Sequence, residues 1–499
     1  MLLIILGVLT ALVFLLWIYS SPFHWKRKGV PYLLPLPIFG SNLPSFRMSL
    51  TDFYDYLYSQ FPDEKYFGFH YFMKPTLFIK DPALMKDICI KDFEHFTRNG
   101  FYSNEDDPLG ENLLFIYGQA WKEMHEKISP LFTPAKLRCI QGYVENSMVK
   151  VHKCIKDKIA ANEPVKIERL TIGIATNVIV QAIFGIETDC FEENSKFVDV
   201  GNKMFCTKTN LKLVLSMIAP DLNDFFKLHT FGEDVNNFLR NILKNVIKYR
   251  ESNPVKNQDF VNVMMNMMKT AKERNGKQYF PDKTKMPNND FNTALAQALI
   301  LYAGGAESAA MTMAFFLYEA ALNQEIQDKC RDEIMAVVNE TGTDIRPEDI
   351  NELTYLDMAL KETMRKYPPF ALIARKCTKT YKFRDSDLTI EPGTLLIAPT
   401  KSTQWDPKNF PNPEAFIPER FADKSTVDSG AYIVWGLGPR ICIGKNFAKM
   451  EMVLAISRLL RNYKFTISSK MEVPVKQCRY TAVITPNPGI FLDVEPIGA

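Results

Sequence analysis

A single cysteine stands in a local sequence that could hold a metal-bound cofactor. Residues 435–444 read WGLGPRICIG, so Cys442 lies between glycines and two positions after Arg440. Gly438 and Gly444 would let the backbone approach a flat ligand closely and direct amides at the sulfur. The arginine is suited to pair with a carboxylate on that ligand. An amphipathic helix is expected directly after the cysteine, and a helix N-terminus stabilises a thiolate.

Two plainer interpretations compete with a ligand role for this loop. A lone cysteine beside a turn is often a buried structural residue. A dinucleotide-binding loop is a poorer alternative, because Gly436-Leu437-Gly438 lacks the third glycine and a preceding strand. The nine cysteines include no CxxC pair, so zinc ribbons and thioredoxin-like motifs are not indicated.

A second group of candidate residues lies on a long apolar segment, residues 292–322. Its centre reads AGGAES, and it carries Glu307 followed by Ser308. An acid next to a hydroxyl could relay protons, and the small residues would let a helix open above a bound ligand. The alternative is a kinked core helix with one solvated acid.

A third group could form a charge network. Glu362 and Arg365 are spaced i to i+3, which places both side chains on one helix face. Many exposed helices carry such a pair, so on its own the pair is a weak signal.

Together these motifs resemble the cytochrome P450 superfamily. The cysteine loop is similar to the family's haem-binding sequence F-x-x-G-x-R-x-C-x-G, with Trp435 in the phenylalanine position. The glutamate–arginine pair resembles the family's E-x-x-R motif, and residues 303–308 resemble A/G-G-x-D/E-T-T/S. In the last motif Ser308 stands where threonine is usual, and Ala309 replaces the next hydroxyl.

The resemblance implies haem b with Cys442 as its axial ligand. Trp121 resembles the start of the family motif W-x-x-x-R, with His125 in the arginine position, and Arg375 resembles a further arginine that binds a haem propionate. The implied cofactor-binding residues are Cys442, Arg440, Trp121, Arg375, Gly438 and Gly444; the implied structural network is Glu362, Arg365 and Arg420. The segments 26–31 and 103–109 resemble insect microsomal members related to drug- and steroid-oxidising P450s.

The implied activity is a monooxygenase that inserts one oxygen atom of O2 into a lipophilic xenobiotic or endogenous lipid or hormone. Glu307 and Ser308 would be the catalytic residues. Electrons would come from NADPH-cytochrome P450 reductase, with cytochrome b5 as a further candidate donor. A basic docking face for an acidic partner is expected at Lys122, Lys127, Lys445 and Lys449.

Two other functions remain open on the same fold. One is an isomerase or dehydratase that acts on peroxides without a reductase, and Ser308 and Ala309 make it worth considering. The other is a non-catalytic haem-thiolate protein that binds lipophilic ligands, against which the intact Glu307 argues.

The elements that must position these residues begin with an apolar N-terminus. Residues 2–19 carry no charge and are followed by Lys26, Arg27 and Lys28. This pattern predicts an uncleaved transmembrane helix with the rest of the chain on the cytoplasmic side. The expected divisions are an anchor at 1–20, a basic and proline-rich linker at 21–40 and a haem-thiolate catalytic domain at 41–499. The resemblance places such a single-pass protein in the endoplasmic reticulum membrane.

The rest of the chain predicts one mainly α domain with small β-sheets. A hairpin is expected at 66–80, helices dominate 83–340, strands are expected at 376–400, and a helix returns at 444–461. Hydrophobic residues make up 46% of the chain and the net charge is +3, so nucleic acid is not indicated as a partner. An apolar pocket is expected from the segments 101–115, 204–235, 303–308 and 370–373.

Overall fold

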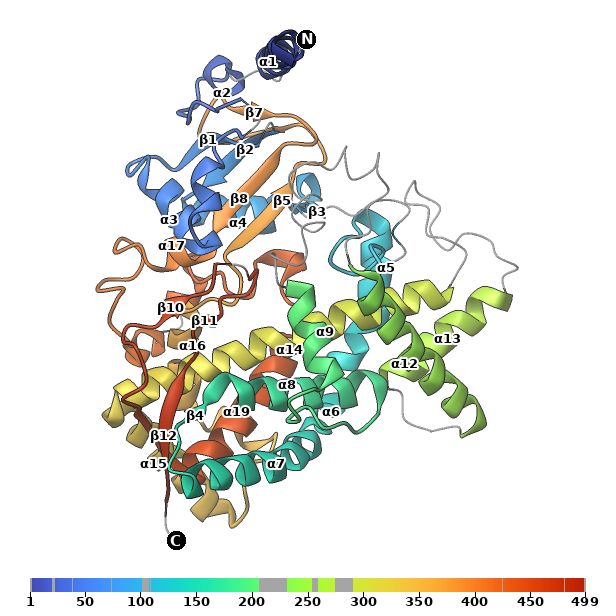
Figure 1. Ribbon diagram of the computed structural model, residues 1–499, viewed down its shortest axis with the longest axis vertical. Helices are drawn as coiled ribbons and strands as arrows, with labels where there is room; N and C mark the ends of the chain where they lie inside the picture. Colours follow the sequence, from blue (N-terminus) through green and yellow to red (C-terminus); the bar gives the residue numbers. More distant parts are fainter. Residues whose placement is uncertain are drawn as a thin grey trace.

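The computed structural model describes residues 2–19, 23–37, 39–72, 74–100, 107, 109–205, 231–253, 259–273, 290–423, 425–479 and 481–497. Helices dominate and the sheets are small, as the sequence predicts. A mixed sheet and its covering helices form the end near the N-terminus, and a helical body forms the rest (Figure 1).

The largest sheet joins two parts of the chain that are far apart in sequence. Its five strands run in the order β1-β2-β8-β5-β3. The predicted hairpin at 66–80 is confirmed, because β1 and β2 pair antiparallel from Tyr66 opposite Ile79 to Tyr71 opposite Lys74. The strands are β1 (Tyr66–Tyr71), β2 (Lys74–Ile79), β3 (Arg98–Asn99), β5 (Leu372–Lys376) and β8 (Leu395–Pro399).

The strands expected at 376–400 are present, but the first begins earlier than predicted. Strand β5 starts at Leu372 because its whole length pairs with β8, from Leu372 opposite Pro399 to Lys376 opposite Leu395. The smaller sheets are formed by β4 (Val165–Lys166), β9 (Tyr463–Ile467) and β12 (Phe491–Pro496), by β6 (Tyr381–Lys382) and β7 (Thr389–Ile390), and by β10 (Lys476–Gln477) and β11 (Pro486–Asn487).

Helix α14 (Asp290–Leu322) runs through the middle of the body and packs against α8 (Ile167–Phe184) (Figure 1). Both are long and apolar enough to span a membrane, but most of their residues are buried among other helices, so they form the core. A Cβ at Gly305 would lie 2.5 Å from Ile179 Cδ1, and the missing side chain therefore permits this close packing.

The remaining helices surround this pair and include the predicted C-terminal helix, which begins at Lys445. They are α3 (Leu50–Ser59), α4 (Pro82–Lys86), α5 (Gly118–Ile128), α6 (Pro134–Leu137), α7 (Ile140–Ala160), α9 (Lys196–Phe205), α12 (Glu233–Ser252), α13 (Phe260–Glu273), α15 (Gln324–Thr341), α16 (Thr354–Lys366), α17 (Thr400–Gln404), α18 (Ser425–Asp428) and α19 (Lys445–Asn462).

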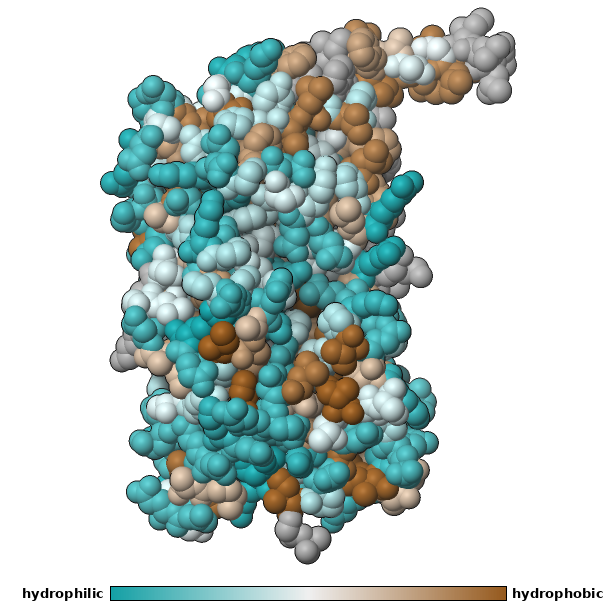
Figure 2. All heavy atoms as spheres, turned by 90° about the vertical axis from the view of Figure 1, so that its left-hand side faces the viewer, coloured by the Kyte–Doolittle hydropathy of each residue, from teal (hydrophilic) through white to brown (hydrophobic). Residues whose placement is uncertain are grey.

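The apolar N-terminus forms helix α1 (Leu2–Tyr19), which projects from the body at the end that carries the five-stranded sheet (Figure 1). Its exposed large hydrophobic side chains are Ile5, Leu6, Val8, Leu9, Leu12, Phe14 and Leu15. Hydrophobic surface is gathered beside this helix in the space-filling view (Figure 2). After α1, a short helix α2 (His24–Arg27) brings the chain onto the sheet.

Candidate active site

Cys442 lies just before α19, and Gly444 is the N-cap of that helix. The backbone amides of Gly444 and Lys445 donate hydrogen bonds to its sulfur and lower the pKa of the thiol, as expected for a helix N-terminus. Desolvation by the surrounding protein is the larger effect, so the pKa is raised overall. The helix N-terminus therefore acts in the expected direction, but in the polypeptide alone burial outweighs it.

The cysteine is desolvated by protein and yet keeps exposed surface. The side chain therefore has many protein atoms around it and still faces open space. The loop that presents it is closed by a hydrogen bond from the Cys442 amide to the Trp435 carbonyl, at 2.8 Å. A soft thiolate ligand facing open space is suited to a metal cofactor.

Gly438 and Gly444 play different structural roles in the loop. Gly438 has φ +69°, and a Cβ there would collide with the carbonyl oxygen of Cys89. It therefore makes room for a neighbouring backbone, where we expected close approach of a flat ligand. A Cβ at Gly444 would lie 3.8 Å from the Cys442 sulfur, which is ordinary contact. The contribution of Gly444 is its amide.

Arg440 and Arg375 come together near this loop, and neither meets a carboxylate among the described residues. The Arg440 guanidinium donates to the carbonyls of Thr97 at 2.9 Å and Ile116 at 2.7 Å. Burial and then the charge of Arg375 lower its pKa to about 9. Two like charges held together in a buried place are costly unless an anion joins them.

Each of these two arginines also has one hydrogen-bond donor that is not used. The Nε atoms of Arg375 and Arg440 are buried and have no hydrogen-bond partner. Arg375 otherwise donates to Asn99 Oδ1 at 2.9 Å. Uncompensated positive charge and unused donors fit a cofactor that carries carboxylates, as haem does.

Trp121 and His125 lie one turn apart on α5 and share this cluster. The Arg440 guanidinium carbon is 4.3 Å from the Trp121 ring centroid, and the rings of Trp121 and His125 are 5.0 Å apart. Burial and the charge of Arg440 lower the pKa of His125. The histidine is therefore neutral near pH 7 and does not supply the charge of the arginine expected at this position.

On α14, Gly304 and Gly305 face different surroundings. Gly304 is exposed in the middle of a mostly buried helix, and a Cβ there would meet nothing within 4 Å. Ser308 Oγ donates to the Gly304 carbonyl at 2.7 Å, the usual i to i−4 bond of a helical serine. The helix thus has one open position, with a hydroxyl one turn away. Glu307 is half-buried, and its charge helps to raise the pKa of Tyr302.

Glu362, Arg365 and Arg420 are in contact. Arg365 forms a two-point ion pair with Glu362, at 2.7 Å and 2.9 Å, and both side chains are fully buried. Arg420 Nε lies 3.3 Å from the same carboxylate. Remaining donors of the two arginines reach backbone carbonyls of residues 404 and 411–415. The network ties α16 to the long segment before the cysteine loop.

Sequence reasoning missed Gln297, which is fully buried on α14. Its side chain accepts from the Leu113 amide at 2.9 Å and donates to the Glu111 carbonyl at 2.8 Å. The Arg440 guanidinium also donates hydrogen bonds to this segment, to the carbonyls of Leu113 and Ile116. The sequence signal that could have indicated this residue is a polar amide side chain in an otherwise apolar stretch of helix.

Parts of the expected pocket and docking face can be placed. Residues 101–106, 108 and 206–230 lie outside the described residues; Leu109, Leu113 and Phe115 are buried in the main core. In the expected docking face, Lys122 and Lys445 are exposed, whereas Lys449 forms an ion pair with Asp357 at 2.8 Å.

Comparison with known proteins agrees with this site. The model of the cytochrome P450 family matches residues 30–494. The chain is 31% identical over 488 residues to probable cytochrome P450 6a14 of Drosophila melanogaster, covering 95% of each protein. It is 30% identical over 510 residues to cytochrome P450 6A1 of Musca domestica, covering 99% of this chain and 97% of the relative. It is 29% identical to cytochrome P450 6k1 of Blattella germanica, covering 94% and 92%.

The match extends over nearly the whole chain, and these relatives are insect proteins, as the sequence motifs predicted. Membership implies a haem-thiolate cofactor, a redox partner and a small-molecule substrate. The chain belongs to the cytochrome P450 family and is an oxidoreductase of the monooxygenase class.

Proposed function

We propose that this chain is a membrane-anchored monooxygenase whose haem b is ligated by Cys442 and whose substrates are lipophilic. One observation carries the proposal. Cys442, which stands in the family's ligand position, is desolvated, receives hydrogen bonds from two backbone amides and still keeps exposed surface. The haem, when bound, supplies oxygen binding and the redox chemistry of oxygen transfer.

Arg375, Arg440 and Trp121 would hold the cofactor's carboxylates. The two guanidiniums offer unused Nε donors and an uncompensated positive charge. The Trp121 ring packs over Arg440 and restricts its orientation. His125 is neutral in this setting, so its contribution is a hydrogen bond and shape rather than charge.

Ser308 and Glu307 would hold and move the protons that oxygen transfer requires. The Ser308 hydroxyl is held 2.7 Å from the Gly304 carbonyl, beside the open position of α14. From there the hydroxyl could donate a proton to a ligand, and Glu307, the next residue of the helix, would be the acid that supplies protons to this region. Serine lacks the methyl group that fixes the rotamer of threonine, so the relay is less strictly oriented than in most relatives of this motif.

A separate flavoprotein, NADPH-cytochrome P450 reductase, would deliver the electrons, with cytochrome b5 as a further candidate donor. Lys122 and Lys445 are exposed, and Lys445 lies three residues after Cys442, so these two lysines would support docking of an acidic partner. Lys449 contributes little, because Asp357 already neutralises it.

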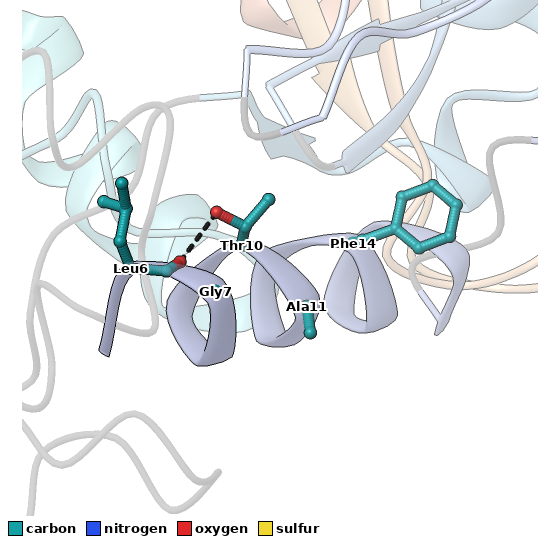
Figure 3. A pocket seen from close by; sticks show the side chains of 5 residues that line it. All are labelled: Leu6, Gly7, Thr10, Ala11 and Phe14. Atoms are coloured by element: carbon teal, nitrogen blue, oxygen red, sulfur yellow. Dashed lines mark hydrogen bonds between the residues drawn. The ribbon is translucent and has the colours of Figure 1, made fainter. Parts of the chain in front are cut away.

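Helix α1 would anchor the chain in the endoplasmic reticulum membrane. Its 18 residues give a length of about 27 Å at 1.5 Å per residue, close to the thickness of a bilayer core. Thr10 donates its hydroxyl to the Leu6 carbonyl at 2.8 Å, so this polar group is satisfied within the helix (Figure 3). Lys26, Arg27 and Lys28 follow on the side that stays cytoplasmic.

The proposal is tested by reconstituting the purified protein with the reductase and a panel of lipophilic substrates. We expect NADPH consumption and oxygenated products that both require reductase. Turnover of hydroperoxides by the protein alone, without NADPH consumption when reductase is present, would contradict the monooxygenase and support the isomerase or dehydratase alternative. Binding-induced changes in the haem spectrum without any turnover would support a non-catalytic ligand binder.

A further inference from the structure

A π-helical turn lies against the cysteine loop. It is η2 (Asp87–Lys91), which continues directly from α4. The Asp92 amide donates to the Asp87 carbonyl at 2.8 Å, with the five-residue spacing that defines this wide turn. Single turns of this kind are rare and occur frequently at functional sites, so the contacts of η2 indicate what it does.

The backbone of η2 packs directly against the backbone of the cysteine loop at Gly438. A Cβ at Gly438 would collide with the Cys89 carbonyl oxygen, and it would lie 2.8 Å from the carbonyl carbon and 3.4 Å from Ile90 Cα. A backbone group cannot turn aside as the end of a flexible side chain can, and a close-packed interior transmits the resulting strain. The Cys89 carbonyl therefore limits how closely the loop can approach η2.

The same stretch of chain contacts the cysteine segment at a second point. Gly430 has φ +84°, and a Cβ there would lie 2.7 Å from Lys86 Cδ and 2.9 Å from the Pro82 carbonyl oxygen. Between the two glycines, Leu437 packs against the buried apolar cluster to which η2 belongs. Helix α4 and η2 thus lie along the cysteine segment, with two close contacts between them.

The turn η2 is itself fixed to the five-stranded sheet. Ile88 and Cys89 are fully buried in an apolar cluster with residues of β2 and β8. At the end of the turn, Asp92 accepts hydrogen bonds from the Tyr381 hydroxyl at 2.8 Å and from the Arg384 guanidinium at 2.6 Å. The turn is therefore a fixed surface, and the loop that packs on it takes its position from it.

Two hydrogen bonds connect the contact at Gly438 to the cysteine. The Gly438 carbonyl accepts from the Ile441 amide at 2.9 Å, and the Cys442 amide donates to the Trp435 carbonyl at 2.8 Å. Both bonds close the same short loop. A displacement of Gly438 is therefore expected to move Cys442 as well.

We propose that η2 is a positioning element for the haem ligand: its Cys89 carbonyl, packed against Gly438, fixes the place at which the loop presents the Cys442 sulfur. This inference rests on the proposed role of Cys442. The axial ligand and its surroundings set the electronic properties of a haem iron. A loop pushed away from η2 should therefore hold its sulfur less well and make it a weaker ligand.

The test compares two alanine substitutions in the same loop of the full-length, haem-loaded protein. Gly438→Ala and Gly436→Ala both place a side chain at a left-handed φ, +69° and +79° respectively. Only the first collides with η2, because the nearest neighbour of a Cβ at Gly436 would be the Arg440 carbonyl oxygen at 3.5 Å, an ordinary contact. The difference between the two variants isolates the contact with η2 from the strain of the backbone.

Two measurements report on the ligand rather than on folding. The first is the rate at which the thiolate-type band of the reduced carbon monoxide complex converts to the ordinary type on mild warming. We expect this rate to be roughly tenfold higher in Gly438→Ala than in Gly436→Ala, which corresponds to an overpacking cost near the low end of its range. The second is the reduction potential of the iron, which should be higher in Gly438→Ala because a weaker thiolate stabilises the ferric state less.

Ile88→Val disturbs the turn without changing the loop, and it decides the question if Gly438→Ala does not fold. Removing one methyl group from this fully buried side chain loosens η2. We expect the band to convert roughly threefold faster than in the wild type. Ile79→Val, which changes a fully buried isoleucine of β2 in the same cluster, is the matched control and should convert at the wild-type rate.

The outcomes separate this inference from the proposed function. Equal conversion rates and equal potentials in Gly438→Ala and Gly436→Ala would overturn the role of η2, and so would a wild-type rate in Ile88→Val. Either result leaves Cys442 as the ligand, provided that the wild type gives the thiolate-type band. An ordinary imidazole-type band in the wild type would instead contradict the proposed function itself.

Discussion

Two buried arginine clusters support the cysteine loop, and they differ in how their charge is balanced. In the first, Arg365 and Arg420 share the carboxylate of Glu362, and backbone carbonyls take their remaining donors. In the second, Arg375 and Arg440 have no carboxylate among the described residues and keep unused Nε atoms. The first cluster is complete in the polypeptide, whereas the second is completed by the anion we expect on the cofactor. Removing a residue should therefore affect folding in the first case and cofactor retention in the second.

The largest effect is expected in the first cluster. Glu362→Ala leaves two buried or half-buried guanidiniums without their carboxylate, which costs ~3–5 kcal/mol of unfolding free energy. We expect little soluble holoprotein and a much lower midpoint of chemical denaturation. Glu419→Gln, an exposed acid in the neighbouring turn Pro418–Phe421, is the matched control and should be nearly neutral. Wild-type stability in Glu362→Ala would remove the basis of the comparison.

In the second cluster we expect faster haem loss with little change in the stability of the apoprotein. Arg375→Met removes charge-assisted hydrogen bonds worth ~1.5–3 kcal/mol each to a bound carboxylate, which corresponds to roughly 10- to 150-fold faster dissociation. Haem transfer to an apoglobin measures this rate, and denaturation of the apoprotein measures stability. Arg365→Met is the contrasting variant and should lose stability even without haem. Equal losses of apoprotein stability in the two variants would contradict the distinction.

Helix α14 lies outside both clusters, so a change at Ser308 should affect chemistry alone. Ser308→Ala removes the hydroxyl that bonds to Gly304. We expect product formed per NADPH consumed to fall about tenfold, less than the ~100-fold that a positioned proton donor typically contributes to a rate, with haem retention unchanged. Ser308→Thr restores a hydroxyl and should keep or improve this ratio. If Ser308→Ala formed as much product per NADPH consumed as the wild type, Ser308 would not take part in proton delivery.

The smallest effect concerns His125 at the edge of the second cluster. Its pKa in the folded chain is lowered from 6.5, by burial first and then by Arg440, so the unfolded chain binds more protons between the two pKa values. Stability should therefore fall as the pH drops below about 6.5, and this contribution is absent above it. Comparing denaturation of His125→Gln and wild type from pH 5 to 7.5 isolates the effect. A wild type that loses no more stability than the variant at low pH would disprove it.

Much of the architecture could be predicted because it follows from local patterns. The hairpin at 66–80, the long apolar helix around Glu307 and the helix after Cys442 are set by periodicity and turn residues. The start of β5 at Leu372 was missed because it depends on pairing with β8 more than 20 residues later. Nonlocal partners of this kind leave no local signal.

In the site, too, features set by local sequence could be predicted and features set by distant residues could not. The spacing of Glu362 and Arg365 indicates a shared helix face, but the carbonyls that receive Arg365 come from residues 404 and 413–415 and could not be inferred. Gly438 was predicted to admit a flat ligand, yet the neighbour that requires a glycine there is the Cys89 carbonyl, which is set by tertiary packing. The raised pKa of the Cys442 thiol also required the structure, because burial outweighs the helix terminus.

The central claim is that Cys442 ligates the haem iron, and the absorption spectrum of the reduced protein with carbon monoxide tests it most directly. The wild type should give the strongly red-shifted Soret band of a thiolate-ligated haem, and Cys442→Ala should lose that band together with most of its bound haem. A wild-type band of the ordinary imidazole type, or full haem retention with an unchanged spectrum in Cys442→Ala, would contradict the assignment.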